Sequence, residues 1–345
     1  MTDTTTATIA RPALAAYSAA LEGAALYDSA ALGRVWMRDR DRAALLHRLS
    51  SNHIERLKPG EGTQTVLTTQ IGRIIDLLTV HCLDDALLLV TSPGRGRAIF
   101  SHLRKNIFFN DKVQAEDASA ALGQLTLYGP RATALLADLG LPGAELPPFG
   151  IAVASWREAP LYVARTLPIG GAGLSLIAAP AALAELGVAL QAAGATPLDE
   201  ATHEVLRVEQ GQAAYGHELS LEYIPLETGL WGAVSFNKGC YVGQEIIARM
   251  ESRGRLAKQL RGLRFALPPQ LAAEPQTPLA KLAVGGKEAG DLTSLAESPR
   301  HGLIGLAYVR TAHAEPGTVV RVGGVEATVT MLPFDRRQES GGSDQ

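Results

Sequence analysis

The chain has 345 residues and a formal net charge of −3, and 46% of its residues are hydrophobic. This length predicts two or three domains, and the near-neutral charge excludes a chain-wide cationic surface for nucleic acid. The two cysteines, Cys82 and Cys240, are too few for a disulfide framework, a four-thiolate zinc site or a self-sufficient iron–sulfur site. We therefore expect any thiol chemistry to involve a single cysteine.

The N-terminus lacks the basic and then apolar order of a secretory signal. The longest apolar stretch, residues 174–193, contains Pro180 and Glu185. Pro180 at a first helical position favours a strand followed by a helix over a membrane span. The polar residues 336–345 predict a disordered tail. We expect a cytoplasmic protein that does not enter a membrane.

The first part of the chain alternates between helices and strands. Leu45, Leu46 and Leu49 share one face of a short helix that begins after Asp41. The other elements predicted here are strands over 65–69, 73–83, 86–90 and 124–128, a helix over 95–107 and a helix over 130–140. Residues 141–150, with three prolines and two glycines, are interpreted as a linker.

A similar order of elements follows this linker. Strands are predicted over 162–166 and 174–178, and helices over 180–193 and 199–210. Two such αβ units suggest an internal structural duplication. After about residue 255 the chain changes to short alternating runs, and Gly323-Gly324 joins the last two as a hairpin signal. This pattern predicts a small antiparallel barrel or a sandwich.

Chemically unusual residues are densest between Arg207 and Arg255. This region contains the run Lys238-Gly-Cys-Tyr-Val-Gly-Gln-Glu245, whose glycines suit a backbone that approaches another group closely. Cys240 lies just before a predicted helix over 243–253, and a helix N-terminus and a neighbouring ammonium both favour a thiolate. The thiol could attack an electrophile, bind a metal or exchange with a disulfide, or it could only fill a turn.

Other candidate sites are less specific. Cys82 lies in an apolar strand and is interpreted as a core residue. The histidines, including His203 and His217, form no metal-ligand pattern, so we expect no metal site. Five basic residues between 249 and 261 fit either a solvated helix face or a site for an anionic tail or partner.

The run 238–245 matches the signature K-G-C-Y-x-G-Q-E. On this run the chain resembles the YgfZ group of folate-binding proteins, within the GcvT superfamily of the glycine-cleavage T-protein. Other stretches that read like the family in the same order are residues 52–60, 72–76, 129–130, 207–219 and 225–230. The resemblance implies a cloverleaf of three domains around a central channel that binds a tetrahydrofolate.

The resemblance also implies the fold class. We expect an α+β protein with two ferredoxin-like α/β domains and a C-terminal antiparallel β-barrel. The expected limits are residues 1–145 and 146–255 for the α/β domains and residues 256–335 for the barrel. Because the two α/β domains of this superfamily exchange segments, these linear limits simplify the arrangement.

Three departures from the T-protein pattern bear on the activity. The T-protein stretch Asn-Ala-x-Asn-x-x-Lys-Asp corresponds here to residues 91–98, which contain no carboxylate. The motif Arg-Thr-Gly-Tyr-Thr-Gly-Glu corresponds to residues 165–171, where the acid is again absent, and Lys-Gly-Asp becomes Lys238-Gly239-Cys240. Because orienting a pterin and assisting amine chemistry both need a positioned carboxylate, we do not expect an aminomethyltransferase.

The resemblance thus implies a tetrahydrofolate-binding accessory protein for the assembly or repair of iron–sulfur clusters in client enzymes. Cys240 would be the reactive thiol, and Lys238 would favour its thiolate form. A single thiol leaves the other iron positions of a transient cluster to a partner, so we expect client or assembly proteins as partners. The alternatives are a folate-dependent aminomethyl or one-carbon transferase and a non-catalytic folate-binding module.

The family motifs also suggest which residues bind the cofactor. Arg207 and Tyr215 are expected to line the pocket, because folate has an anionic tail and a flat ring. The loop residues expected to shape the mouth of the channel are Gly239, Tyr241, Gly243 and Gln244.

Overall fold

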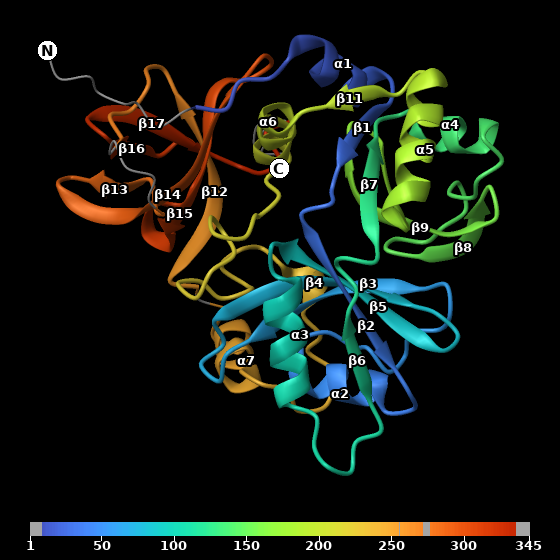
Figure 1. Cartoon of the computed structure of the whole chain (residues 1–345). Coiled ribbons are helices and arrows are strands. Elements are labelled where there is room, and N and C mark those ends of the chain that lie inside the picture. Colours follow the sequence, from blue (N-terminus) through green and yellow to red (C-terminus); the bar gives the residue numbers. More distant parts are fainter. Residues whose placement is uncertain (1–8, 255, 272–276, 336–345) are drawn as a thin grey trace, which may run out of the picture.

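The structure is a computed structural model that describes residues 9–254, 256–271 and 277–335. Three lobes meet in the middle of the molecule: a barrel at the left of Figure 1, an α/β lobe at the upper right and a second α/β lobe below. This arrangement confirms the predicted combination of two α/β units and a C-terminal β domain.

The lower lobe contains a five-stranded antiparallel sheet with strand order β3-β4-β5-β2-β6. Its elements are β2 (Leu32–Arg38), α2 (Arg42–Leu49), β3 (Gly62–Thr68), β4 (Ile74–Cys82), β5 (Ala86–Pro93), α3 (Gly96–Lys105) and β6 (Gln114–Asp117). The two helices pack on one face of the sheet around Leu78 and Ile99. The predicted apolar face of α2 is buried. The carboxylate of Asp41 does not cap α2, since it accepts a hydrogen bond from the Lys112 backbone N–H instead.

The upper lobe contains a six-stranded sheet with strand order β11-β1-β7-β10-β9-β8, in which only the pair β1 and β11 is parallel. Its strands are β1 (Ala25–Asp28), β7 (Gly123–Tyr128), β8 (Ile151–Trp156), β9 (Ala159–Ile169), β10 (Ala172–Ala178) and β11 (Thr196–Leu198). The helices α4 (Ala132–Asp138) and α5 (Pro180–Ala192) cover its outer face. As predicted, α5 begins at Pro180.

The predicted boundary at residue 145 does not follow the sheets. β1 and β7 precede that residue, yet both lie inside the upper sheet, where Leu127 of β7 pairs with Leu174 of β10. The chain therefore crosses to the lower lobe after β1 and returns after β6. A linear boundary fails here because strand pairing in an antiparallel sheet joins segments far apart in the sequence.

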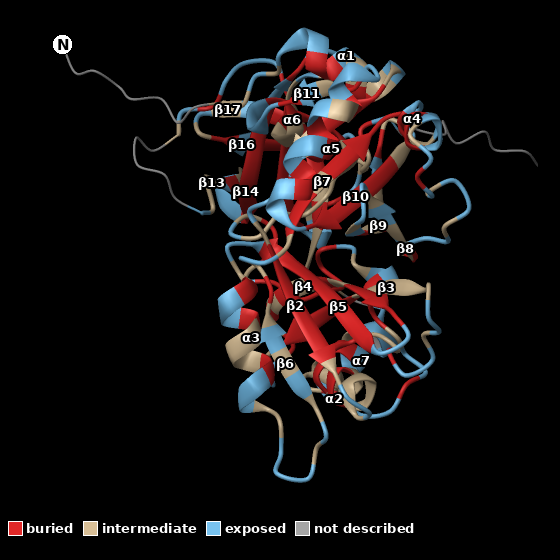
Figure 2. Cartoon of the chain, turned by 45° about the vertical axis from the view of Figure 1, so that its right-hand side comes forward, coloured by how far each residue is buried: buried red, intermediate tan, exposed pale blue. Residues whose placement is uncertain are grey.

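The two sheets face each other. Trp36 and Leu88 of the lower sheet pack with Ala164 and Ile177 of the upper sheet. The layers of this half of the molecule are therefore helices, sheet, sheet and helices. Figure 2 shows buried residues concentrated on the strands, and exposed residues on the helices and loops.

The C-terminal lobe is a closed antiparallel barrel with strand order β12-β15-β14-β13-β16-β17. Its strands are β12 (Lys258–Phe265), β13 (Ala280–Val284), β14 (Lys287–Ser298), β15 (Gly302–Arg310), β16 (Val319–Val322) and β17 (Val325–Thr330). β12 pairs with both β15 and β17 and so closes the barrel, which excludes the sandwich. Gly323 and Gly324 have φ values of 51° and 83° and form the predicted hairpin turn.

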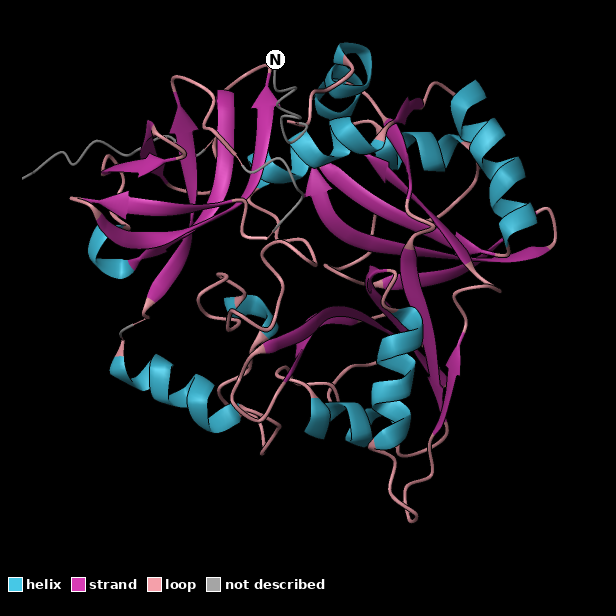
Figure 3. Ribbon diagram, turned by 60° about the vertical axis from the view of Figure 1, so that its left-hand side comes forward, coloured by secondary structure: helices cyan, strands magenta, loops and turns pink. Residues whose placement is uncertain are grey.

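Two helices connect the upper sheet to the barrel. α1 (Leu14–Glu22) packs against α6 (Glu200–Gln210), and α6 also contacts β14 and β15. After α6 the chain runs through an irregular segment with a 3₁₀ turn, Trp231–Ala233, to α7 (Gln244–Arg253). The first turn of α7 lies beside Gly72 in the turn between β3 and β4, and Figure 3 shows the helix below the barrel. A second 3₁₀ turn spans Thr311–His313.

Two further expectations concern a membrane-spanning helix and the C-terminal tail. Within the described ranges, no helix is both long and apolar enough to cross a bilayer. The predicted disordered tail, residues 336–345, lies outside the described residues.

Candidate functional site

A cavity of about 340 Å³ lies between the facing sheets. Its walls come from β4 and β5 of the lower sheet, from β1, β7 and β10 of the upper sheet, and from α6 and the segment after it. Because side chains alternate along a strand, Gln124, Thr126 and Tyr128 of β7 face the cavity, while Leu127 packs with the helices on the other side. We call this space the central cavity.

Aromatic side chains form one wall of the central cavity. Tyr27 and His203 stack with ring centroids 4.0 Å apart and planes 2° apart, and the Tyr128 ring lies 5.8 Å from His203. Tyr27 donates its hydroxyl to Glu200 Oε2 at 2.5 Å. Burial lowers the pKa of His203 to about 4, so this ring is neutral at pH 7. The sequence gives no signal for this wall, because its members lie on β1, β7 and α6.

Buried polar side chains on the upper sheet form a second wall. The hydroxyls of Ser29 and Thr126 lie 2.7 Å apart, and Gln124 donates its Nε2 to Ser175 Oγ at 3.0 Å. Gln124 is 3% exposed, and its Oε1 has no hydrogen-bond partner among the residues that the structure describes. The cavity therefore contains one buried acceptor whose hydrogen bond is not made by the chain itself.

Carboxylates also lie at the central cavity. Glu200 and Glu204 line it. Asp76 is buried beside it and accepts a hydrogen bond from the hydroxyl of Ser92, which is a lining residue. Burial raises the pKa of Asp76 to about 6.

The two segments that correspond to the T-protein's acidic motifs do reach the central cavity. Residues 91–93 and 166–167 line it. They contribute hydroxyl and apolar groups, whereas the carboxylates come from α6 and β4. These carboxylates lie outside the two acidic motifs of the T-protein, so a comparison of those motifs does not predict them.

Arg207 reaches the central cavity but is committed to the protein. Its five N–H groups all donate to oxygens of Glu204, Gln212, Glu218 and Ser294. Although burial lowers the pKa of Arg207, the carboxylates of Glu218 and Glu204 outweigh this effect and raise it. Arg207 therefore joins α6 to the barrel, and its geometry does not favour the expected contact with an anionic ligand tail.

Tyr215 also lines the central cavity, so the structure brings together the two residues that were expected to line the pocket. The guanidinium of Arg95 lies 4.5 Å from the centroid of the Tyr215 ring. Gly216, with a φ of 85°, turns the chain there and lets Tyr215 form a bridge with Leu219.

Lys238 lies away from the central cavity. Its ammonium donates to the backbone carbonyls of His47, Ser50 and Asn52, the last two at 2.6 and 2.8 Å. Burial lowers the pKa of Lys238 to about 8. These carbonyls lie in the last turn of α2 and just after it, at the end of the helix where a cation also interacts favourably with the helix dipole. All three ammonium hydrogens are thus used, which differs from the expected action of Lys238 on the Cys240 thiol.

The rest of this run is fixed to the turn between β3 and β4. Thr68 donates its hydroxyl to the Val242 carbonyl at 2.6 Å. Gly243 has a φ of 84°, and a Cβ on it would lie 2.6 Å from the Thr69 carbonyl oxygen. Of the described residues that line the central cavity, none comes from 238–245. The expected place of this run at the channel mouth is therefore not what the structure shows.

Individual residues of the run have different surroundings. Tyr241 is buried with Leu226 and Ile247, and its backbone N–H donates to Gln244 Oε1 at 3.3 Å. The Cys240 thiol, in contrast, is exposed. Tyr241 and Gln244 thus hold the loop in place and leave Cys240 at the surface.

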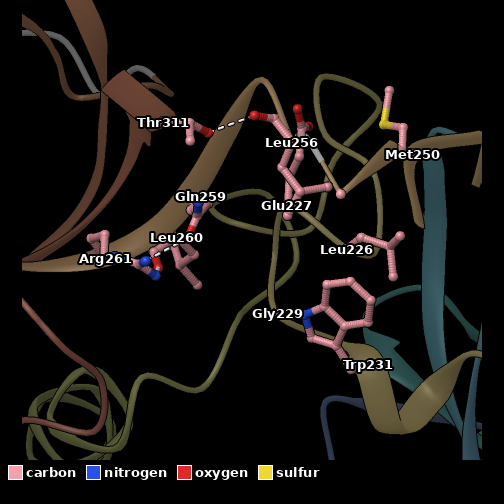
Figure 4. Close-up of a pocket in the computed structure, with 11 residues that line it drawn as sticks. Leu226, Glu227, Gly229, Trp231, Met250, Leu256, Gln259, Leu260, Arg261 and Thr311 are labelled. Atoms are coloured by element: carbon pink, nitrogen blue, oxygen red, sulfur yellow. Dashed lines mark hydrogen bonds between the residues drawn. The ribbon is translucent and has the colours of Figure 1, made fainter. Parts of the chain in front are cut away.

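A second cavity of about 290 Å³ lies beside α7 (Figure 4). Leu226, Trp231, Met250 and Leu260 give it apolar walls, and Glu227 contributes a carboxylate whose pKa is raised by burial. Trp231 belongs to this cavity and not to the central one. A change in Trp231 fluorescence would therefore report on the region around α7.

The family of the chain follows from its similarity to known proteins. Residues 7–238 match the family described as the GCVT N-terminal domain, and residues 258–335 match the glycine cleavage T-protein C-terminal barrel domain. The chain belongs to the GcvT family.

Individual relatives agree with this assignment. The chain is 33% identical over 319 residues to "Putative transferase At1g60990, chloroplastic" of Arabidopsis thaliana, and the match covers 92% of this chain and 72% of that protein. It is 32% identical over 326 residues to an aminomethyltransferase of Rubrobacter xylanophilus, and this match covers 92% of the chain and 84% of the relative.

A solved structure confirms the fold. The glycine cleavage system aminomethyltransferase T from Bartonella henselae superposes with a TM-score of 0.83 at 23% identity, over 93% of this chain and 89% of that one. The predicted fold, with two α/β domains and a C-terminal β-barrel, is therefore confirmed. The names of these relatives do not distinguish the YgfZ group from the aminomethyltransferases.

Proposed function

We propose that the central cavity binds a tetrahydrofolate and that the chain, as a YgfZ-type protein, supports the assembly or repair of iron–sulfur clusters in client enzymes. The observation that carries the folate part is the lining of the cavity. Aromatic rings suit a flat pterin, and the unpartnered Oε1 of Gln124 suits a ligand with N–H groups. Family membership supports the same ligand, which would supply a one-carbon carrier.

The residues present also suggest how the ligand lies. Among the described residues that line the central cavity, Arg207 is the one cation, and its N–H groups are already used. The pterin therefore occupies the cavity, and the anionic tail extends towards solvent, where water solvates its carboxylates.

Cys240 supports the iron–sulfur part of the proposal. Its thiol is exposed and lies outside the lining of the central cavity. A partner protein can therefore reach the thiol while the cavity holds a folate. A single thiolate supplies one ligand to an iron–sulfur cluster, so the cluster is a transient cargo whose other ligands come from the client or assembly protein.

Calorimetric titration with 5-formyltetrahydrofolate tests the folate part. Thr79 lines the central cavity, so Thr79→Phe fills part of this space, while Thr79→Val keeps its size and serves as the matched control. We expect wild type and Thr79→Val to bind with similar affinity and Thr79→Phe to bind at least tenfold more weakly. Absence of binding by the wild type would overturn the assignment.

Complementation of a strain that lacks this protein tests the thiol. Cys240→Ser should fail to restore the activity of iron–sulfur enzymes, while Cys82→Val, which changes the buried cysteine, should restore it. Restoration by Cys240→Ser to the wild-type level would count against a thiol-based role and would favour a non-catalytic folate-binding module.

Folate-dependent aminomethyl transfer is the second candidate. Similarity to named aminomethyltransferases favours it, and Glu200 and Glu204 supply carboxylates at the cavity. We place it second because the acids of both T-protein motifs are absent. Turnover of an aminomethyl donor by the purified protein with tetrahydrofolate, lost in Glu204→Gln, would reverse this order.

A further inference from the structure

The buried amide of Gln124 is satisfied at one end only. Its Nε2 donates to Ser175 Oγ, and its Oε1 is buried without a partner in the described part of the chain. A buried acceptor left unpaired costs about 1–3 kcal/mol. The neighbouring hydroxyls of Ser29 and Thr126 bond to each other, and neither donates to Gln124 Oε1.

The strand fixes the direction in which Gln124 extends. Gln124, Thr126 and Tyr128 occupy alternate positions of β7 and all three line the central cavity, as does Ser175 on the adjacent β10. The amide is therefore held on the cavity wall by a strand pair at the centre of a sheet. Such a position is more rigid than one on a loop, and rigid groups select among ligands more sharply.

The aromatic wall narrows the chemistry of the occupant. The rings of Tyr27 and His203 stack in parallel planes, and His203 is neutral, so a further flat and uncharged ring can extend this stack. A flat ring with an N–H group at its edge could both stack on the aromatic wall and donate a hydrogen bond to Gln124 Oε1.

We propose that Gln124 is the residue that selects the ligand by accepting a hydrogen bond from a ring-edge N–H group through its Oε1. This inference rests on the proposed function: the donors of a reduced pterin are the amino and ring N–H groups of its edge. Gln124 thus performs, from β7, the orienting role for which the T-protein motif at residues 165–171 provides a carboxylate.

Three variants test this role with 5-formyltetrahydrofolate as the probe in calorimetric titrations. Gln124→Met keeps the size of the side chain and removes the acceptor, so we expect binding to weaken by about tenfold. Gln124→Glu retains an acceptor towards the ligand, because Ser175 can reverse its hydroxyl and donate to the carboxylate, so we expect affinity within about threefold of the wild type. Leu125→Met changes the neighbouring residue on the other face of β7 and serves as the control.

The thermal stability of the ligand-free protein gives a second readout. Gln124→Met removes the buried unpaired oxygen together with the hydrogen bond from Nε2 to Ser175 Oγ, so the two effects oppose each other and we expect the melting temperature of the ligand-free protein to change little while binding weakens. Loss of a side chain with only a structural role would instead lower the melting temperature together with the affinity.

The outcomes separate this inference from the proposed function. If the wild type binds the probe and Gln124→Met binds it equally well, Gln124 does not select the ligand, although the folate site stands. Weaker binding by Gln124→Glu than by Gln124→Met would also overturn the inference, because it would mean that the amide donates. Absence of binding by the wild type would overturn the folate site itself.

Discussion

Within the described ranges, Asp76 has no N–H or O–H partner at Oδ2, and its side chain is fully buried. Its Oδ1 accepts hydrogen bonds from Ser92 and from the backbone N–H of Leu77. Burial still outweighs these interactions and raises the pKa to about 6 from 3.8. The folded protein therefore binds a proton at Asp76 more tightly than the unfolded chain does. The free energy of unfolding therefore falls as the pH rises from 3.8 to about 6. Above about pH 6 the full cost of burying the ionised carboxylate is present.

Asp76→Asn should therefore stabilise the protein at neutral pH. The amide retains the shape of the carboxyl group without its charge, so we expect the melting temperature at pH 7.5 to rise by about 3 °C or more. The gain should shrink at pH 4.5, where the wild-type carboxyl is already protonated in the folded state. Melting curves at the two pH values measure this effect, and an equal difference at both would contradict it.

Lys238, in the run 238–245, offers a second test that changes a single residue. Lys238→Met leaves three backbone carbonyls at the end of α2 without their donor, so we expect a loss of about 2–4 kcal/mol in the free energy of unfolding. Cys240→Ser, two residues away and exposed, is the control and should leave this free energy unchanged. Chemical denaturation measures both, and a Lys238→Met variant as stable as the control would show that this anchor contributes nothing.

The sequence identifies the motif residues of the site, but it does not identify the groups that they contact. Lys238, Arg207 and Tyr215 all lie in runs that match a family motif, so their importance was predictable. The acceptors of Lys238 lie nearly 190 residues earlier in the chain, and one acceptor of Arg207 lies on the barrel. Only the folded chain shows that both cations are used for internal hydrogen bonds.

At the scale of elements, the loop before α7 depends on a close backbone approach. A Cβ at position 243 would lie 2.6 Å from the Thr69 carbonyl oxygen, and the φ of 84° is unfavourable for any residue with a side chain. At Gly239, in contrast, no atom lies within 4 Å of the same added Cβ. The two glycines of one motif therefore have different structural requirements.

This difference predicts opposite results for two similar changes. Gly243→Ala should lower the free energy of unfolding by about 2 kcal/mol or more, because the loop must shift or strain. Gly239→Ala should change it by less than about 0.5 kcal/mol. Denaturant melts of the two variants check this expectation, which fails if both glycines tolerate alanine equally.

Elements with strong local signals were predicted well. Pro180 marks the start of α5, Asp199 caps α6 through the Thr202 N–H, and the glycine pair makes the hairpin of the barrel. Neither α1 nor β1 is predicted from the sequence. α1 is rich in alanine and lacks a side-chain cap, and β1 is only four residues long, so neither has a local pattern that stands out.

At the scale of the whole molecule, the two α/β lobes depend on each other. β1 and β7 come from the N-terminal part of the chain and lie between β11 and β10 in the upper sheet. The central cavity lies between the sheets, so it exists only when both sheets are formed. This exchange of strands explains why linear domain limits describe the protein poorly.

Fragments of the chain test this interdependence. A fragment of residues 1–145 contains β1 and β7 without β10 and β11, so we expect it to lack a cooperative thermal transition. Residues 146–255 lack β1 and β7, which lie between β11 and β10 in the sheet, and should behave in the same way. A combined fragment of residues 9–254 is the control and should show cooperative unfolding. A cooperative transition in either short fragment would contradict the exchanged arrangement.

The most direct test of the central claim is a crystal structure with 5-formyltetrahydrofolate bound. We expect the pterin in the central cavity, beside Tyr27 and His203, with a ring-edge N–H group within hydrogen-bond distance of Gln124 Oε1. Cys240 should remain exposed in the same structure. A folate bound in the cavity beside α7, or at the surface near Cys240, with the central cavity empty, would contradict the account.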